Sequence, residues 1–337
     1  MKRIGFLSFG HYRHVVGARV PDATAALRQH VEFARIADEV GLDGAWVRVH
    51  HFEQSHASPM PLLAAMAAVT SRIDVGTGVL DLRYENPLHL AEQAAATDLI
   101  SGGRLQLGIS RGSPEQAVDG QRQFGYRLSD GESWADHAQA KAARFRRAIA
   151  GEPVAHSAEA QAAGEGPDLP IRPLSPGLPD RIWWGAGSAE SGIWTAEQGM
   201  NLLSSTLLLA DDGRPFHIQQ ADQVRGYRRV FHRLGHSGPG WAAVTRPVFP
   251  ITSDDDRRYF GFRGDAHDHV GILDGSKARS GPQMVGSVED VAAMLRADEA
   301  VTEADYVLFA MPSQLGVDYN AHWMQNLVDV ARELGWK

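Results

Sequence analysis

The sequence predicts an α/β fold, a (β/α)8 TIM barrel with insertions, and two observations lead to this prediction. Eight short apolar segments alternate with stretches of helical periodicity along the 337 residues, a pattern typical of a parallel sheet covered by helices. A barrel of this kind needs about 250 residues, and the surplus fits insertions at about residues 113–180 and 254–282. We therefore expect one barrel domain, residues 1–337, that carries these insertions.

The first half of the chain supplies four of the predicted strand–helix units. Its apolar runs are short and end at Gly, Pro or polar residues, as buried strands do. Between these runs, Gly41 and Gly102 follow helical stretches and Pro87 begins one, which is the expected asymmetry of helix ends. We expect strands at residues 4–9, 44–49, 73–80 and 105–110, and helices at 22–40, 61–69, 87–100 and 133–150. Residues 113–131 show little periodicity and are expected to form a long loop.

The second half resumes the alternation after a segment, residues 152–180, whose Pro, Gly and Ala content predicts either a loop or a small hairpin. Ser287 and Asp290 have the spacing of a capping box at a helix start. Residues 254–282 are polar and contain Gly, and we expect them to be irregular. The remaining strands are expected at 181–186, 201–209, 241–251 and 304–311, and the remaining helices at 189–198, 215–234, 287–297 and 319–334.

The composition excludes several classes of function. Lys and Arg total 33 against 41 Asp and Glu, a net charge of −8, so a nucleic-acid or anionic-membrane partner is not expected. Cysteine is absent, which excludes disulfides and thiolate metal sites. His pairs such as His11 with His14 lack a third ligand at diagnostic spacing, and no metal site is expected. No long apolar stretch or signal peptide is visible, and the default expectation is a cytoplasmic protein.

Polar side chains follow several predicted strands at the point where each strand ends. Examples are His50 and His51 after the second strand, and Ser110 and Arg111 after the fourth. Active sites of (β/α)8 barrels lie at the C-terminal ends of the strands. The pattern therefore predicts a barrel enzyme whose site is built from these residues.

Three segments occur in an order that carries a family resemblance. They are ARIADEVGLDGAWVRVHHF (34–52), GTGVLDLRYENPLHLAEQAAATDLISGGRLQLGISRG (76–112) and RIWWGAGSAES (181–191). Together they resemble the bacterial luciferase-like flavin-dependent monooxygenase family. The resemblance implies a barrel that binds reduced FMN, which a separate flavin reductase supplies. It also implies that oxygen adds to the flavin at C4a and that the hydroperoxide oxygenates a small organic substrate.

The resemblance assigns His50 a catalytic role, because it stands where the family's Glu-His-His-Phe motif has a functional histidine. His50 is then a base or a hydrogen-bond donor near the flavin or the substrate; the alternative is a packing histidine at a strand end. Val49 replaces the motif's Glu, which puts any role of a carboxylate there in doubt. His51 and His11 are candidates for the substrate pocket, with packing and a solvated loop as their respective alternatives.

The same resemblance places the cofactor on three segments. Arg111 can pair with the FMN phosphate through its forked donors, or form a salt bridge at the barrel rim, and Ser110 lies near the ring. Gly187, Ser188 and Ala189 begin a helix whose N-terminus suits a phosphate, with Ser191 as a companion; an ordinary N-cap explains the same residues. Gly76 and Thr77 are expected to face the flavin ring, or to form a bulge that closes the barrel.

Two other functions remain open. One is a deazaflavin-dependent oxidoreductase of the same superfamily, which transfers hydride, and the other is a flavin-binding relative without catalysis. The family also implies a homodimer that packs through the helices near the second and third strands, where alanines are frequent; packing within the chain explains the same alanines. The sequence does not identify the substrate. We read both indoles of Trp183 and Trp184 as packing groups, one toward the barrel interior and one toward the outer helices.

Overall fold

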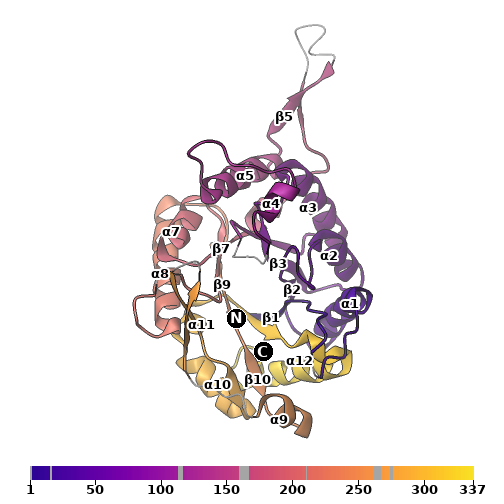
Figure 1. Cartoon of the computed structure of the whole chain (residues 1–337), viewed down its shortest axis with the longest axis vertical. Coiled ribbons are helices and arrows are strands. Elements are labelled where there is room, and N and C mark those ends of the chain that lie inside the picture. Colours follow the sequence, from indigo (N-terminus) through magenta and orange to yellow (C-terminus); the bar gives the residue numbers. More distant parts are fainter. Residues whose placement is uncertain are drawn as a thin grey trace.

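A computed structural model of the chain describes residues 2–15, 17–112, 117–158, 167–209, 211–261, 267–273 and 276–337. In this part of the chain eight parallel strands close into a barrel (Figure 1), which confirms the predicted (β/α)8 fold. Around the ring they follow the order β1, β14, β9, β8, β7, β4, β3, β2. In chain order these strands are β1 Arg3–Ser8, β2 Gly44–Val47, β3 Asp74–Asp81, β4 Leu105–Ser110, β7 Ile182–Ala186, β8 Asn201–Ser204, β9 Ala242–Arg246 and β14 Tyr306–Met311.

Helices surround the ring (Figure 1) and begin and end at residues of the expected types. The side chain of Asn86 accepts hydrogen bonds from the first N–H groups of α3, and Gly102, with a φ of 68°, ends that helix. The helices that cover the barrel are α1 Ala23–Val40, α2 Pro59–Ala68, α3 Pro87–Ser101, α5 Trp134–Ile149, α7 Ala189–Glu197, α8 Phe216–Leu234, α10 Val288–Ala297, α11 Glu299–Glu303 and α12 Gly316–Glu333. No helix among the described residues has both the length and the apolar character that crossing a bilayer requires.

Aromatic side chains fill the interior of the ring. The rings of Trp46 and Trp183, and those of Trp46 and Tyr306, meet edge to face with centroids 5.5 Å apart. Gly76 borders this cluster, where a Cβ atom would lie 2.8 Å from the Trp46 indole and 2.7 Å from the carbonyl oxygen of Gln106. The strand can therefore carry only glycine here, because the barrel interior is already close-packed.

Two predicted strands differ from the observed ones by more than two residues. The strand expected at 201–209 ends at Ser204, because Leu208 pairs instead with Arg279 outside the barrel. The strand expected at 241–251 divides at Pro247, which has no N–H to donate to a ladder. The part that follows, β10 (Val248–Pro250), pairs in parallel with β13 (Met284–Gly286).

The insertions contain more regular structure than predicted. Helix α4 (Gly120–Gln123) interrupts the expected loop at 113–131, and β5 (Pro153–His156) pairs antiparallel with β6 (Asp168–Pro170), which confirms the hairpin alternative. The prediction of an irregular segment at 254–282 is wrong. It contains α9 (Asp254–Phe260) and an antiparallel hairpin of β11 (His269–Leu273) and β12 (Ser276–Ser280). Short 3-10 turns lie at Leu178–Arg181 and Ser313–Leu315.

Candidate active site

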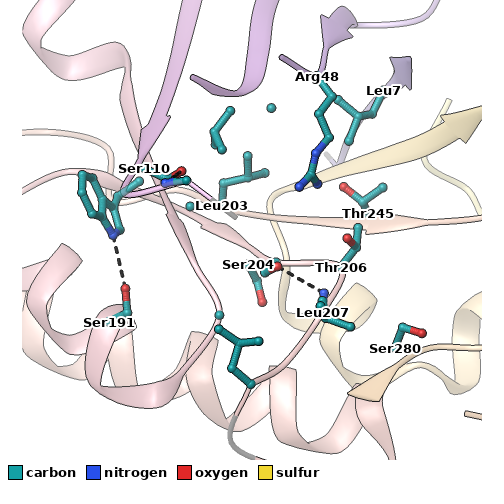
Figure 2. Close-up of a pocket in the computed structure, with 18 of the residues that line it drawn as sticks. Leu7, Arg48, Ser110, Ser191, Leu203, Ser204, Thr206, Leu207, Thr245 and Ser280 are labelled. Carbon is teal, nitrogen blue, oxygen red and sulfur yellow. Dashed lines mark hydrogen bonds between the residues drawn. The ribbon is translucent and has the colours of Figure 1, made fainter. Parts of the chain in front are cut away.

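A cavity of about 1200 Å³ opens at the C-terminal ends of the barrel strands, where the sequence placed the site. Leu7, Val79 and Leu203 contribute apolar side chains to its wall. Figure 2 shows Leu7 and Leu203 together with polar groups from neighbouring strands. Ligand pockets commonly measure about 300–1000 Å³. The volume is therefore large enough for a cofactor and a second small molecule together.

One side of the cavity has the donors of an anion-binding site. Arg111 follows β4 and Ser188 follows β7, and these strands are neighbours in the ring. Ser188 is the N-cap of α7, and its hydroxyl accepts the N–H of Ser191 at 3.3 Å. The N–H groups of Ala189 and Glu190 have no acceptor among the described residues. A guanidinium and free helix N–H groups on one wall favour a phosphate ligand.

Two glutamines of α8 hold the loops that carry this side. Gln223 donates to the carbonyl oxygen of Ser188 at 2.6 Å and accepts the hydroxyl of Ser204 at 2.6 Å. Gln220 donates to the carbonyl oxygen of Ser205 at 2.7 Å. Because these side chains satisfy the loop carbonyls, the ends of β7 and β8 keep a fixed position relative to each other.

The opposite side of the cavity contains Arg48 and His50. The Nε of Arg48 donates to Nε2 of His50 at 2.9 Å, and its guanidinium lies over the ring of Phe9, 5.4 Å from the centroid. Burial, and then the positive charge of Arg48, lower the pKa of His50 to about 4. His50 is therefore neutral at physiological pH, and its Nε2 acts as an acceptor.

Two other charged groups at the cavity, Arg246 and Asp81, are paired within the chain, whereas Glu190 at the start of α7 lines the cavity without an ion pair among the described residues. Arg246 forms a two-point ion pair with Asp298, with distances of 2.7 and 3.0 Å, and both side chains are buried. Asp81 is paired with Arg83. Since these charges have partners within the chain, Arg111 and Arg48 are the lining cations left for ligands among the described residues.

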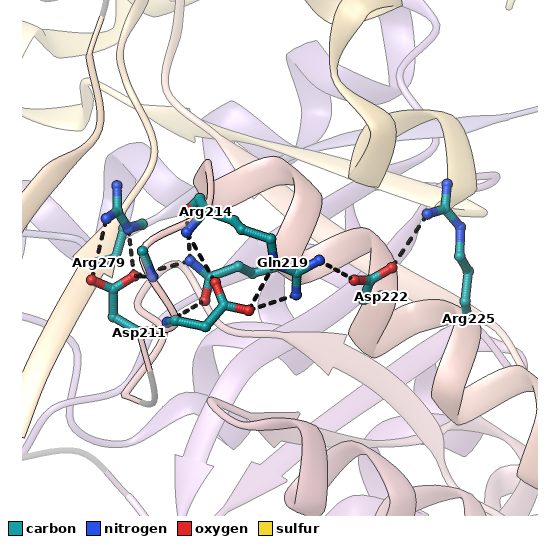
Figure 3. Close-up of polar contacts among 8 residues, drawn as sticks. Asp211, Arg214, Gln219, Asp222, Arg225 and Arg279 are labelled. Atoms are coloured by element: carbon teal, nitrogen blue, oxygen red, sulfur yellow. Dashed lines mark hydrogen bonds and ion pairs between the residues drawn. The ribbon is translucent and has the colours of Figure 1, made fainter.

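The β11–β12 hairpin forms an outer wall, because His269, Ser280 and Gly281 line the cavity. Arg279 fixes this hairpin through hydrogen bonds to both carboxylate oxygens of Asp211, at 2.7 and 3.2 Å (Figure 3), and through an ion pair to Asp268 at 3.0 Å. Asp268 in turn accepts the N–H of Phe216 at the start of α8. The hairpin is thus tied to the loop after β8 and to α8.

The structure brings most of the predicted site residues to this one cavity. Those that line it are His50, Ser110, Arg111, Gly187, Ser188 and Ser191. Gly76, Thr77, Ala189, His11 and His51 do not line it. The hydroxyl of Thr77 donates to the carbonyl oxygen of Gly108 at 2.8 Å inside the barrel wall, and β3 loses its register with β4 just beyond, as expected for a bulge.

The two remaining histidines pack behind the wall. The ring of His51 stacks on Tyr84, with centroids 4.2 Å apart, and the ring of His11 stacks on Phe9 at 5.7 Å. Phe9 lines the cavity, so His11 backs the wall without forming it. The contact of His51 matches its packing alternative, whereas His11 stacks on Phe9 and therefore fits neither the substrate pocket nor the solvated loop that the sequence left open for it.

Val79, Trp184 and Arg48 are among the lining residues that sequence reasoning did not assign to the cavity. Val79 lines it and is joined by a cis peptide bond to Gly78, which also lines it and belongs to the glycine-containing segment that the resemblance placed at the flavin ring. Trp183 packs in the barrel interior and Trp184 packs against Trp194 of α7, with centroids 4.7 Å apart, which confirms the predicted packing; Trp184 also lines the cavity and donates to the hydroxyl of Ser191 at 3.2 Å. Arg48 has a signal in the sequence: it continues the alternation of Gly44 and Trp46, which face the barrel interior.

The chain is similar to a family model, to several proteins of known sequence and to several solved structures. A model of the luciferase-like monooxygenase family matches residues 2–258. The chain is 36% identical over 115 residues to 4-hydroxyprotoasukamycin monooxygenase of Streptomyces nodosus subsp. asukaensis, covering 34% of this chain and 30% of that protein. It is 39% identical over 85 residues to the oxygenase component of the flavin-dependent trigonelline monooxygenase of Acinetobacter baylyi, covering 25% and 24%.

Another relative has a different cofactor in its name. The F420-dependent glucose-6-phosphate dehydrogenase of Amycolatopsis mediterranei is 40% identical over 102 residues, covering 28% of this chain and 30% of that protein. Each of these three alignments spans less than a third of the relative's own length.

Solved structures share the fold over the full length. Monooxygenase RslO1 of Streptomyces bottropensis superposes with a TM-score of 0.74 at 19% identity and covers 98% of this chain and 99% of its own. The oxygenating constituent of 3,6-diketocamphane monooxygenase of Pseudomonas putida, solved with FMN, has a TM-score of 0.69 at 17% identity and covers 99% of both chains.

Proposed function

This chain belongs to the luciferase-like monooxygenase family, and from this premise we propose that it is the oxygenase of a two-component flavin system. In this proposal it uses reduced FMN and O2 to oxygenate a small organic substrate. The observation that carries the proposal is the convergence of Arg111 and the free start of α7 on one wall of the large cavity.

The residues present fit FMN. Arg111, the hydroxyl of Ser188 and the N–H groups of Ala189 and Glu190 are the donors that would hold the phosphate. A Cβ atom at Gly185 would lie 3.0 Å from Val79 and 3.3 Å from the side chain of Ser110. Because Gly185 has no side chain, the cavity keeps free space at this point, and a flat ring can lie there.

Reduced FMN, when bound, supplies the electrons with which O2 is activated. The chain's own part is to orient the ring, exclude water and offer hydrogen bonds. Of the two roles that the sequence left open, base or hydrogen-bond donor, His50 fits the donor. Its neutral ring accepts from Arg48 at Nε2 and carries its proton on Nδ1. In the proposal His50 is thus a donor toward the cofactor or the substrate.

A separate flavin reductase is the proposed partner. Support comes from the trigonelline enzyme, which is named as the oxygenase component of its system. We also propose a homodimer through α2 and α3. Ala91, Ala94 and Ala95 are buried within the chain, which the packing alternative explains, but Ala65 and Ala68 are exposed. Leu99 and Ile100 at the end of α3 are 49% and 58% exposed, and they extend an apolar face.

The test is oxygen uptake by purified protein mixed with photochemically reduced FMN. We expect the protein to bind FMN and to change the rate at which reduced FMN consumes O2. Arg111→Met should raise the FMN dissociation constant roughly tenfold, since it removes a charge-assisted hydrogen-bond donor, whereas Arg147→Met, an exposed arginine on α5, should not. Binding without any effect on oxygen consumption would favour the non-catalytic alternative.

A deazaflavin oxidoreductase is the second candidate, because one relative is named as F420-dependent. Anaerobic titration with F420 separates the two. Tight F420 binding together with weak FMN binding would contradict our proposal. Comparable experiments with the Arg111→Met variant would show whether the same phosphate subsite serves either cofactor.

A further inference from the structure

Arg48 is a cation at the cavity that the FMN site does not use. It is the residue after β2, and its N–H donates to the carbonyl oxygen of Ser8 at 2.8 Å, which continues the pairing of β1 with β2. Trp46, two residues earlier, faces the barrel interior. Because side chains alternate along a strand, Arg48 faces the same way, one layer higher, and lines the cavity.

The guanidinium of Arg48 has no counter-ion within the described part of the chain. Its Nε is bound to the neutral ring of His50, and its two Nη groups have no acceptor there. Glu53 is the carboxylate whose negative charge acts on Arg48, but it already forms an ion pair with Arg13 at 2.9 Å. Burial lowers the pKa of Arg48. A half-buried cation is costly to leave unpaired, so this arrangement is expected where a ligand supplies the negative charge.

Arg48 is also distant in the ring from the proposed phosphate subsite. Arg111 and Ser188 follow β4 and β7, whereas β3 separates β2 from β4. In Figure 2 Arg48 points into the cavity from the side of Leu7 and Thr245, and Ser110 and Ser191 lie across the space from it. The two lining cations therefore serve two different positions in one cavity.

We propose that Arg48 binds an anionic oxygen group, such as a carboxylate, on the substrate. The inference rests on the proposed function, because it assigns the space beside the flavin to the molecule that is oxygenated. Leu7, Phe9 and Leu203 line the cavity near it, so the rest of that molecule is largely apolar. The substrate class is thus an apolar carbon skeleton with one acidic group, held by charge-assisted hydrogen bonds from Nη.

The experiment compares matched acids and alcohols by calorimetric titration, with and without saturating FMN. The probes are hexanoate against hexan-1-ol, and benzoate against benzyl alcohol. Wild-type protein should bind at least one acid about tenfold more tightly than its alcohol, the usual effect of a hydrogen bond to a charged group. Arg48→Met should remove this preference, Arg48→Lys should keep part of it, and Arg111→Met should leave it unchanged.

The variants also distinguish the two sources of an anion. If Arg48→Met weakens FMN binding tenfold and leaves the acid preference intact, Arg48 serves the cofactor and the inference is wrong. Equal binding of acids and alcohols by the wild-type protein overturns it without any variant, so it stays testable even if Arg48→Met does not fold. An Arg48-dependent acid preference in a protein that neither binds FMN nor affects oxygen uptake would contradict the proposed function and leave the anion site standing.

Discussion

The pair of Arg48 and His50 shows how one residue fixes the chemistry of another. A guanidinium can only donate, so the contact at 2.9 Å makes Nε2 of His50 an acceptor and places the proton of the neutral ring on Nδ1. The nearby positive charge also opposes protonation. The pair thus limits His50 to donating through Nδ1, which the sequence alone left undecided between a base and a donor.

A pH profile tests this assignment. Because the pKa of His50 is lowered to about 4, oxygen uptake should show no inflection from His50 between about pH 5.5 and 8.5. His50→Gln, which keeps an N–H donor, should retain more activity than His50→Leu. The measurement is the initial rate of oxygen uptake against pH for the three proteins. An inflection near pH 6.5 that disappears in His50→Gln would show that His50 titrates in turnover.

His30 predicts a second pH effect, on stability. It is fully buried, bonded to the hydroxyl of Ser8 at 2.6 Å and to the carbonyl oxygen of Ala26, and burial lowers its pKa to about 3. The unfolded chain takes up this proton near pH 6.5 and the folded one does not, so stability is full above pH 6.5 and is lost as the pH falls toward 3. Below pH 6.5 the free energy of unfolding therefore falls with decreasing pH. His30→Gln should reduce the slope of the free energy of unfolding against pH by about 1.4 kcal/mol per pH unit.

Urea unfolding between pH 7.5 and 4.5 measures the slope. The matched control is His89→Gln, an exposed position on α3, which should keep the wild-type slope. Identical slopes for wild type and His30→Gln would mean that the buried ring accepts a proton in the folded state.

At the scale of elements, the β11–β12 hairpin depends on Arg279. Its side chain joins Asp211 and Asp268, and its backbone forms a two-bond bridge to Leu208, with both N–O distances 2.9 Å. All three charged side chains are at most 14% exposed. This hairpin and the loop after β8 therefore form one unit at the outer wall of the cavity.

Arg279→Met should loosen that unit. Without the ion pairs, the amide hydrogens of β12 should exchange roughly tenfold faster, because local opening no longer breaks charged hydrogen bonds. Hydrogen exchange followed by mass spectrometry measures this. Arg214→Met is the control: Arg214 bonds Asp212 and Asp222 in the same polar network (Figure 3) but not the hairpin. Equal exchange of β12 in wild type and Arg279→Met would place the stability of the hairpin elsewhere.

Helix α9 has a local sequence signal at its start, whereas the β11–β12 hairpin has none. Ser253 and Asp256 form a capping box with the spacing that predicted the start of α10 at Ser287, and the same rule applied to residues 253–256 would have found α9. The hairpin gives no such local sign. Its fixing contact joins Arg279 to Asp211, 68 positions apart in the chain, and no periodicity within either segment reports it.

For the whole molecule, the sequence predicted the ring because each barrel strand is a short apolar run bounded by turn residues. It predicted the edge of the ring that carries the site for the same reason, since strand ends are local features. It did not predict which side chains face inward. Assigning faces along β2 would have separated Arg48, which lines the cavity, from Val47, which is buried in the outer core. The fold thus follows from the pattern of apolar runs along the sequence. Knowing which side chains line the cavity also requires knowing which residues of each strand face the barrel interior.

The assembly is the last property that belongs to the whole molecule. Leu99 and Ile100 sit where α3 ends beside α2, and Val69 at the end of α2 is 45% exposed. A stable dimer buries about 800 Å² per partner, mainly apolar at its centre. Ile100→Glu places a charge in that centre and should convert a dimer to monomers in sedimentation velocity. Met294→Glu alters an exposed apolar residue of α10, on another side of the barrel (Figure 1), and should remain dimeric. A wild-type monomer at micromolar concentration, or a dimer split only by Met294→Glu, would contradict the α2–α3 interface.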